Sequence, residues 1–202
     1  MSDILYKNLT EKLHFESLLP IQQQVLPIVF DTIESARRRG FHRDCLIAAP
    51  TGSGKTLCYL LPIVHYLQTH AVNRSFKCLI IAPSKDLCLQ IDAVLGKLTS
   101  GTTLRHASIY GSNRRGFKQE HEQLCANAFD IVVSTPVRLI DHVALARSTA
   151  SGSVAATRLF AKLCFLVVDE ADKVVSDDKF KLLIQSIIAD KVIYIYICID
   201  LC

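Results

Sequence analysis

The sequence lacks several features that mark particular classes of protein. Its eight cysteines form no Cys-x-x-Cys pair and lie mostly inside apolar runs, which argues against a zinc site or a disulfide framework and for reduced thiols. The polar, mixed-charge stretch 1–20 does not have the pattern of a signal peptide. No uninterrupted apolar run reaches the length of a membrane span. Together these absences predict a soluble intracellular protein.

A strong net charge is also absent. The 202 residues carry a formal charge of only +4, which permits a polyanionic partner without requiring one. Half of the residues are hydrophobic and 21% are charged, so a large buried core is expected and general disorder is excluded. The chain contains no internal repeat, and its length suits one domain or two small ones.

The most informative stretch that is present is 49–56, Ala-Pro-Thr-Gly-Ser-Gly-Lys-Thr. An apolar run precedes it and a helical pattern follows, and a strand, a Gly-rich turn and a helix together cradle an anion. Gly52 and Gly54 let the backbone approach a phosphate. Lys55 can reach the β- and γ-phosphates, and Thr56 can offer its hydroxyl to Mg²⁺. The stretch therefore predicts a P-loop.

The match to the general P-loop pattern is imperfect, because Ala49 occupies the first glycine position. The plainer interpretation is a Gly-Ser-Gly surface loop with a solvated lysine. The strand–loop–helix context and the Gly-Lys-Thr ending favour the P-loop.

The rest of the chain alternates between two patterns. Short Val/Ile-rich runs, each followed by a helical pattern, indicate an α/β fold with a mostly parallel sheet covered by helices on both faces. The expected strands are 44–49, 77–82, 103–110, 129–133 and 163–168, and the expected helices between them are 55–69, 85–98, 114–127 and 137–147. The small, polar stretch 148–157 predicts a surface loop.

Two helices are expected before the first strand. Residues 3–15 carry an amphipathic pattern, and Pro20 can open a second helix at its first turn. That helix would end at Arg37-Arg38-Arg39, before Gly40. Three arginines before a glycine favour a solvated helix C-terminus; a patch that binds RNA is the alternative.

A pair of carboxylates follows the last of the expected strands. Asp169 and Glu170 come directly after the apolar run Leu166-Val167-Val168, and in an open α/β sheet ligands bind at that carboxyl edge, where the P-loop also lies. Asp169 is placed to hold Mg²⁺, and Glu170 to orient or deprotonate an attacking water. An acidic surface cap is the plainer interpretation of this pair, but its combination with a P-loop favours a nucleotide site.

Taken together these motifs resemble the first RecA-like domain of the DEAD-box ATP-dependent RNA helicases, a P-loop NTPase fold. Asp169-Glu170-Ala171-Asp172 spells the family signature, and 49–56 is close to the family's A-x-T-G-x-G-K-T, so Ala49 is a family trait. Leu19-Pro20-Ile21-Gln22 is similar to the Q motif, whose glutamine reads the adenine edge and implies ATP rather than GTP. Without the family pattern, Gln22 would be interpreted as a solvated helix residue.

Three further stretches resemble the RNA-facing motifs of the family. The first resembles the motif P-T-R-E-L with three conservative substitutions and is Pro83-Ser84-Lys85-Asp86-Leu87. The second has Gly111-Ser112 at the position of the family's Gly-Gly. The third resembles T-P-G-R-L, with valine in place of glycine, and is Thr135-Pro136-Val137-Arg138-Leu139. Each follows a strand and opens a helix, where backbone N–H groups and a basic side chain can face phosphates. Plain helix starts, with Ser84 as a cap and Pro136 in the first turn, are the alternative.

The resemblance implies a set of roles for individual residues. ATP and Mg²⁺ are the implied cofactors, and a sequence-independent RNA backbone is the implied partner. The substitutions at these motif positions resemble those of the ribosome-biogenesis branch of the family. That resemblance implies pre-ribosomal RNA as the partner and a nuclear or nucleolar location. The implied catalytic residues are Lys55, Asp169 and Glu170; the nucleotide-binding residues are Gln22, Thr51, Gly52, Ser53, Gly54, Lys55 and Thr56; the Mg²⁺ ligands are Thr56 and Asp169; and the RNA-binding residues are Pro83, Ser84, Lys85, Gly111, Ser112, Thr135, Pro136 and Arg138.

The family pattern covers about residues 5–190. We expect a Q-motif lead-in over 1–40, a RecA-like domain over 41–190 and an anomalous tail over 191–202, with the second RecA-like domain absent. No Ser-Ala-Thr follows Asp172, and the Ile/Tyr/Cys-rich composition of the tail indicates translated intron or out-of-frame sequence. An improvised edge strand, which would be exposed, apolar and aggregation-prone, is the alternative. Because such ATPases need an arginine from outside this domain, little hydrolysis is expected from this chain alone.

Other functions fit parts of the pattern. A non-catalytic ATP- or RNA-binding fragment of such a helicase is the main alternative. A GTPase or small-molecule kinase would also use a P-loop, but the sequence has no Asn-Lys-x-Asp guanine motif. A DNA translocase remains open as well, because backbone contacts alone do not separate RNA from DNA.

Overall fold

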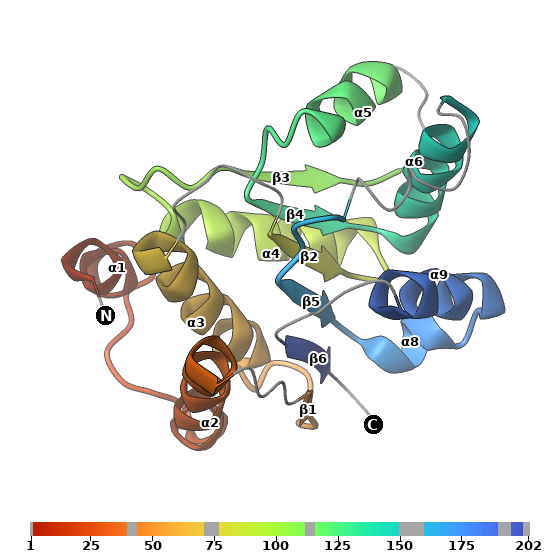
Figure 1. The fold of residues 1–202 in the computed structure, drawn as a ribbon. Coiled ribbons are helices and arrows are strands. Elements are labelled where there is room, and N and C mark those ends of the chain that lie inside the picture. The colour runs from red at the N-terminus through yellow and green to blue at the C-terminus, as the bar shows by residue number, and fades with distance from the viewer. Residues whose placement is uncertain are drawn as a thin grey trace.

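The computed structural model describes residues 2–39, 44–70, 77–111, 116–149, 160–189 and 195–199. Within these residues, six strands form one sheet in which every neighbouring pair is parallel, in the order β1-β6-β5-β2-β4-β3 (Figure 1). The strands are β1 (Cys45–Ile47), β2 (Cys78–Ile81), β3 (His106–Ile109), β4 (Ile131–Ser134), β5 (Phe165–Val168) and β6 (Ile195–Ile199). The predicted α/β fold with a parallel sheet is confirmed.

The helices follow the strands as the alternating pattern predicts. They are α1 (Asp3–Lys7), the π-helical turn η1 (Asn8–Lys12), α2 (Pro20–Arg39), α3 (Lys55–His70), α4 (Lys85–Leu98), α5 (Phe117–Cys125), α6 (Pro136–Thr149), α8 (Ala171–Val175) and α9 (Asp178–Ala189). The single helix expected over 3–15 is instead divided into α1 and η1 and ends at Lys12. The predicted loop 148–157 overlaps the end of α6, and its part from residue 150 on lies outside the described residues.

Helices cover both faces of the sheet (Figure 1). Every residue of β2, β4 and β5 is buried, as expected for parallel strands sandwiched between helices. Ile80 and Val167 face a core built with α2, α3 and α4, whereas Leu79 and Val168 face a second core with α6, α8 and α9. Because side chains alternate along a strand, each strand contributes apolar side chains to the cores under both helical layers.

The C-terminal segment, expected to be an anomalous tail, contains a strand that lies inside the sheet. Residues of β6 pair with β1 on one side, at Cys45–Ile197, and with β5 on the other, at Phe165–Ile195. An edge strand would leave one row of backbone groups unpaired. The run 195–199 is therefore an interior strand and not the exposed edge strand that was one of the two interpretations of the tail.

The N-terminal lead-in packs against the helices of the sheet. The side-chain amide of Asn8 donates hydrogen bonds to the carbonyl oxygens of Leu98 (2.9 Å) and Ser100 (2.8 Å), at the end of α4. Leu5 and Leu9 belong to the same core as the strands. In the described part of the chain, no helix has the length and apolar character needed to cross a membrane, and six cysteines are free thiols, Cys45, Cys58, Cys78, Cys88, Cys125 and Cys164.

Candidate nucleotide and RNA site

The loop between β1 and α3 has the backbone that the P-loop motif requires. Gly52 and Gly54 adopt φ angles of +78° and +89°, in the region that glycine reaches without steric cost. The Ser53 N–H donates to the carbonyl oxygen of Pro50 at 3.2 Å, which closes a turn. The loop then leads directly into α3 at Lys55, so it lies at the positive end of a helix dipole.

Lys55 folds back over this loop. It is 7% exposed, and its ammonium group donates to the carbonyl oxygens of Ala49 and Pro50, the latter at 2.9 Å. The Ser53 Oγ atom is buried and has no hydrogen-bond partner. A buried hydroxyl without a partner is costly, and a phosphate oxygen would supply the acceptor. The loop thus fits a nucleotide phosphate.

The glutamine of the predicted Q motif is buried against the P-loop. Gln22 is 1% exposed, which excludes the solvated-residue interpretation. Its Oε1 accepts from the N–H of Leu19 at 2.9 Å, and its Nε2 donates to the carbonyl oxygen of Gly54 at 3.1 Å. A side-chain amide has two N–H donors and two acceptor lone pairs, so these two bonds leave capacity to read a base edge.

The expected metal-binding carboxylate meets the P-loop helix. Asp169 follows β5 and is 5% exposed, and it accepts from the Tyr59 hydroxyl at 2.8 Å and from the Glu170 N–H at 3.0 Å. Burial raises the pKa of Asp169, while these two hydrogen bonds and the charge of Lys55 lower it in part. Since Tyr59 lies one turn after Lys55 and Thr56 on α3, the two distant motifs are brought together.

Tyr59 is a site residue that the sequence reasoning missed. It is fully buried, and burial together with the charge of Asp169 raises the pKa of its phenol well above the ordinary value. The available signal was its spacing, because residues three and four positions apart share a helix face. Tyr59 stands at those spacings from Thr56 and Lys55.

Glu170, the expected residue for water activation, has an unusual backbone. Its φ and ψ angles of 47° and 55° are left-handed, at the start of α8. Non-glycine residues adopt this conformation at a cost, and such strain clusters at functional sites. The Glu170 carboxylate pairs with the Lys173 ammonium at 2.9 Å, and the nearby Asp172 Oδ1 is buried without a hydrogen-bond partner.

Most of the predicted RNA-facing residues lie at the same edge of the sheet. Pro83 and Ser84 follow β2, and the Ser84 hydroxyl caps α4 by accepting from the Leu87 N–H at 3.2 Å. Lys85 is exposed, with its ammonium 5.4 Å from the centre of the Tyr110 ring. The helix-start interpretation is thus confirmed for Ser84, and it does not exclude contact with RNA.

The strands β3 and β4 carry the remaining candidates. Gly111 is exposed with a φ of +87°, and Ser112 lies outside the described residues. Thr135 is buried and its N–H donates to the carbonyl oxygen of Ile109 at 3.2 Å, while Pro136 opens α6. Because all of these positions follow parallel strands, they share the edge that carries the P-loop.

Arg138 departs from the prediction that it faces phosphates. It is 4% exposed, its Nε donates to Glu120 Oε1 at 2.8 Å, and its guanidinium lies 4.5 Å from the centre of the Phe117 ring. His142, fully buried, contacts the same Glu120 oxygen at 2.5 Å. The packing of α5 against α6 thus buries the guanidinium in an internal network instead of presenting it at the surface.

Comparison with known proteins agrees with these motifs. The family model described as DEAD/DEAH box helicase matches residues 19–194. The chain is 34% identical to the ATP-dependent RNA helicase DBP6 of Lodderomyces elongisporus, over 87% of this chain and 25% of that protein. It is 33% identical to the ATP-dependent RNA helicase DDX51 of Danio rerio, over 79% of this chain and 24% of that protein.

A solved structure shares the fold. The DEAD-box helicase Mss116, bound to ssRNA and UDP-BeF, aligns with a TM-score of 0.74 at 23% identity, over 98% of this chain and 38% of that one. The chain spans about a quarter of the length of the curated relatives that it matches. The match of the family model over most of the sequence establishes that this chain belongs to the DEAD/DEAH box helicase family.

Proposed function

We propose that this chain binds ATP and Mg²⁺ at the carboxyl edge of its sheet and contacts the RNA backbone along the same edge. The single observation that carries the proposal is the hydrogen bond from Tyr59 to Asp169, because it joins the P-loop helix to the strand that bears the acidic motif. Relatives of this chain are named ATP-dependent RNA helicases. Their names support the same assignment here.

The phosphates would be held by the P-loop and the first turn of α3. Backbone N–H groups of 51–56 would face the phosphate oxygens. Lys55 would exchange the carbonyl oxygens of Ala49 and Pro50 for phosphate oxygens, which bear more negative charge. Gln22 would read the adenine edge, since its amide is already oriented by Leu19 and Gly54.

The acidic motif would provide the metal ligand and the base. A bound Mg²⁺ would neutralise phosphate charge, and Thr56 and Asp169 are the side chains that would hold it. The hydrogen bonds from Tyr59 and the Glu170 N–H favour the ionised form of Asp169 that metal binding requires. Glu170 would orient or deprotonate the attacking water, held in place by its ion pair with Lys173.

RNA contact would come from the loops beyond β2, β3 and β4. The exposed Lys85, the exposed backbone of Gly111 and the first turn of α6 at Thr135 and Pro136 would face sugar and phosphate. Such contacts carry little sequence information, which fits a helicase acting on varied duplexes. The ssRNA bound to Mss116, a structure of the same fold, supports RNA over DNA.

In the full-length protein the site would couple ATP hydrolysis to the remodelling of RNA duplexes. By this chain alone we expect binding with little hydrolysis, because phosphoryl transfer in such ATPases draws on an arginine outside the nucleotide-binding domain. The proposed substrate is pre-ribosomal RNA in the nucleus or nucleolus, and the resemblance to the ribosome-biogenesis branch supports this part of the proposal.

A nucleotide panel tests the proposal. We expect the purified chain to bind a fluorescent ATP analogue with Mg²⁺ more tightly than the GTP analogue, because only adenine matches the amide of Gln22. Gln22→Ala should remove that preference, whereas Gln23→Ala, at the exposed neighbouring position, should keep it. Equal affinity for both nucleotides, or none for ATP, would refute the assignment.

A further inference from the structure

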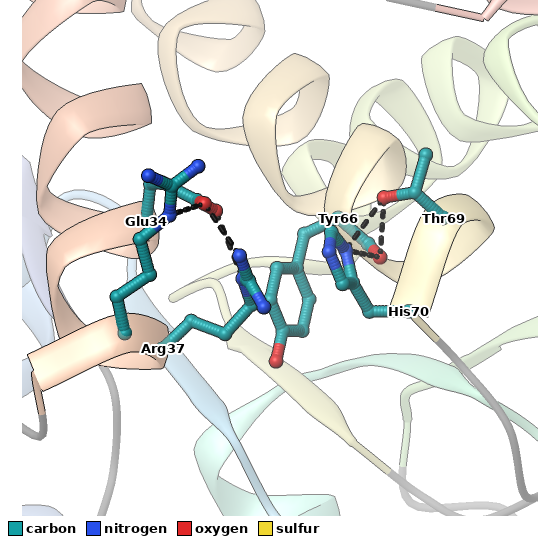
Figure 2. A network of polar contacts seen from close by, with 6 residues as sticks. Glu34, Arg37, Tyr66, Thr69 and His70 are labelled. Atoms are coloured by element: carbon teal, nitrogen blue, oxygen red, sulfur yellow. Dashed lines mark hydrogen bonds and ion pairs between the residues drawn. The ribbon is translucent and has the colours of Figure 1, made fainter.

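The helices α2 and α3 both end at the edge of the sheet opposite the nucleotide site. The 16 residues of α3 run from Lys55 at the P-loop to His70 and span about 24 Å at about 1.5 Å per residue. This far edge, where the strands begin, carries a cluster of basic and aromatic side chains (Figure 2). None of them belongs to the site described above.

The first part of the cluster is a set of arginines on α2. The Glu34 carboxylate accepts two hydrogen bonds from Arg37, at 2.6 and 3.0 Å, and pairs with Arg38 as well. The bonds from Arg37 lower the pKa of Glu34 to about 2, so it is ionised at neutral pH. Arg39 is also exposed. Three guanidinium groups against one carboxylate leave a clear positive excess.

The second part is an aromatic pair on α3. The rings of Tyr66 and His70 stack with their centres 4.8 Å apart and their planes 19° from parallel. His70 is exposed, and its Nδ1 is fixed by the Thr69 hydroxyl at 2.6 Å. Arg37 lies near Tyr66, and Figure 2 shows Arg37, Tyr66, Thr69 and His70 in one view. An exposed, oriented ring beside guanidinium groups is suited to base stacking.

The positive charge continues across the starts of β2 and β5. Tyr66 packs edge-on against Phe165 with ring centres 5.3 Å apart, and the Phe165 N–H donates to the carbonyl oxygen of Lys77 at 2.9 Å. Lys162 is exposed just before β5. The sequence from His65 to Cys78 contains no acidic residue. Lys77 and Lys162 thus precede β2 and β5, and the backbone of Lys77 pairs with Phe165, on which Tyr66 packs.

We propose that this basic–aromatic patch binds a segment of single-stranded RNA apart from the RNA contacts at the nucleotide edge. It consists of Arg37, Arg38, Tyr66, His70, Lys77 and Lys162. Cations that neutralise phosphates release counterions, and aromatic rings stack on bases of any sequence. Helix capping by the arginines accounts for their charge, but it leaves unexplained the exposed His70 ring that stacks on the half-buried Tyr66 beside them. The inference extends the proposed function to RNA binding that does not depend on nucleotide.

The test compares RNA affinity among variants with equal loss of charge. Fluorescence anisotropy with a short labelled oligouridylate is recorded over a range of salt concentrations. Arg37→Gln/Arg38→Gln should weaken binding about tenfold at low salt and reduce the slope of log K against log salt by about 1.4, at about 0.7 for each single-strand phosphate contact. The control is Lys179→Gln/Lys181→Gln, which removes two exposed cations from α9 and should leave both values unchanged.

Further variants separate this patch from the proposed function. His70→Ala should weaken binding through lost stacking, with the salt slope kept, whereas Lys85→Gln probes the nucleotide edge. If Lys85→Gln weakens binding and the double arginine variant does not, the patch is refuted and the proposed RNA site stands. Equal losses of RNA affinity in the double arginine variant and the α9 control would also refute the patch, because binding would then depend only on net charge. Binding of polyglutamate as tight as that of oligouridylate would assign the patch to an acidic protein partner and overturn the RNA proposal.

Discussion

Replacing Tyr59 by phenylalanine would test the contact that joins the two halves of the proposed nucleotide site. Tyr59 is fully buried and its hydroxyl donates to Asp169 at 2.8 Å; phenylalanine keeps the ring and removes only that donor. A hydrogen bond to a charged group contributes about 1.5–3 kcal/mol, so we expect the free energy of unfolding at neutral pH to fall by about 2 kcal/mol. For a chain of this size that corresponds to a melting temperature roughly 4–8 °C lower.

The effect should depend on pH in a defined direction. Burial raises the pKa of Asp169 above its ordinary value, and the bond from Tyr59 lowers it in part by favouring the carboxylate. The contribution of Tyr59 is therefore present when Asp169 is ionised and lost as the pH falls through the pKa of that carboxyl. Urea unfolding followed by circular dichroism, from neutral to acidic pH, should show the wild-type and variant curves converging in acid.

A double-mutant cycle provides the control. In the Asp169→Asn background the carboxylate charge is absent, so Tyr59→Phe should cost less than about half of what it costs in the wild type. Tyr6→Phe removes a hydroxyl from a side chain that is mostly exposed on α1, and it should leave stability unchanged. A loss below about 0.5 kcal/mol for Tyr59→Phe, or an equal loss in both backgrounds, would refute the reasoning.

Two further substitutions test the P-loop and the network between α5 and α6. In Gly54→Ala the new Cβ would lie 2.6 Å from the Q-motif amide nitrogen, so we expect weaker ATP binding by fluorescence titration. Gly101→Ala, with φ of +74° and open space around the Cβ, should bind ATP normally; equal binding by both variants would contradict this. Glu120→Gln removes the carboxylate that Arg138 and His142 contact, and it should cost about 3 kcal/mol by urea unfolding at neutral pH. Burial raises the pKa of Glu120, but the hydrogen bonds from His142 and Arg138 outweigh this effect, so the pKa is lowered overall. The stability cost of Glu120→Gln should therefore vanish as the pH falls through the pKa of Glu120. A cost that does not depend on pH would argue against the network.

The position of the site was predictable because parallel strands share an edge. The P-loop and Asp169 are more than a hundred residues apart in the sequence, yet each follows a buried strand. That placement is enough to bring them together. What the sequence could not show is which side chain makes the contact. Tyr59 meets Asp169 only because of how α3 lies against β5.

Two other features depended on packing that no local pattern reveals. Arg138 lies in the first turn of α6, where the sequence predicted that it would face solvent. In the structure, Phe117 and Glu120 on α5 enclose its guanidinium. The segment 195–199 was expected to be, at most, an improvised edge strand, but it lies between β1 and β5 in the sheet. In both cases the position of the residues depends on elements that are distant in the sequence. The periodicity of the local sequence does not predict where those elements lie.

The central claim, that nucleotide binds between the P-loop and Asp169, is tested most directly by hydrogen exchange with mass spectrometry. Adding ATP and Mg²⁺ to the chain should slow the exchange of amides in 51–56 and around 168–170, because the loop N–H groups would then donate to phosphate and the acidic motif would be held by the metal. Lys55→Ala should abolish that protection. Unchanged exchange in both segments, or protection confined to the opposite edge at 66–70, would contradict the account.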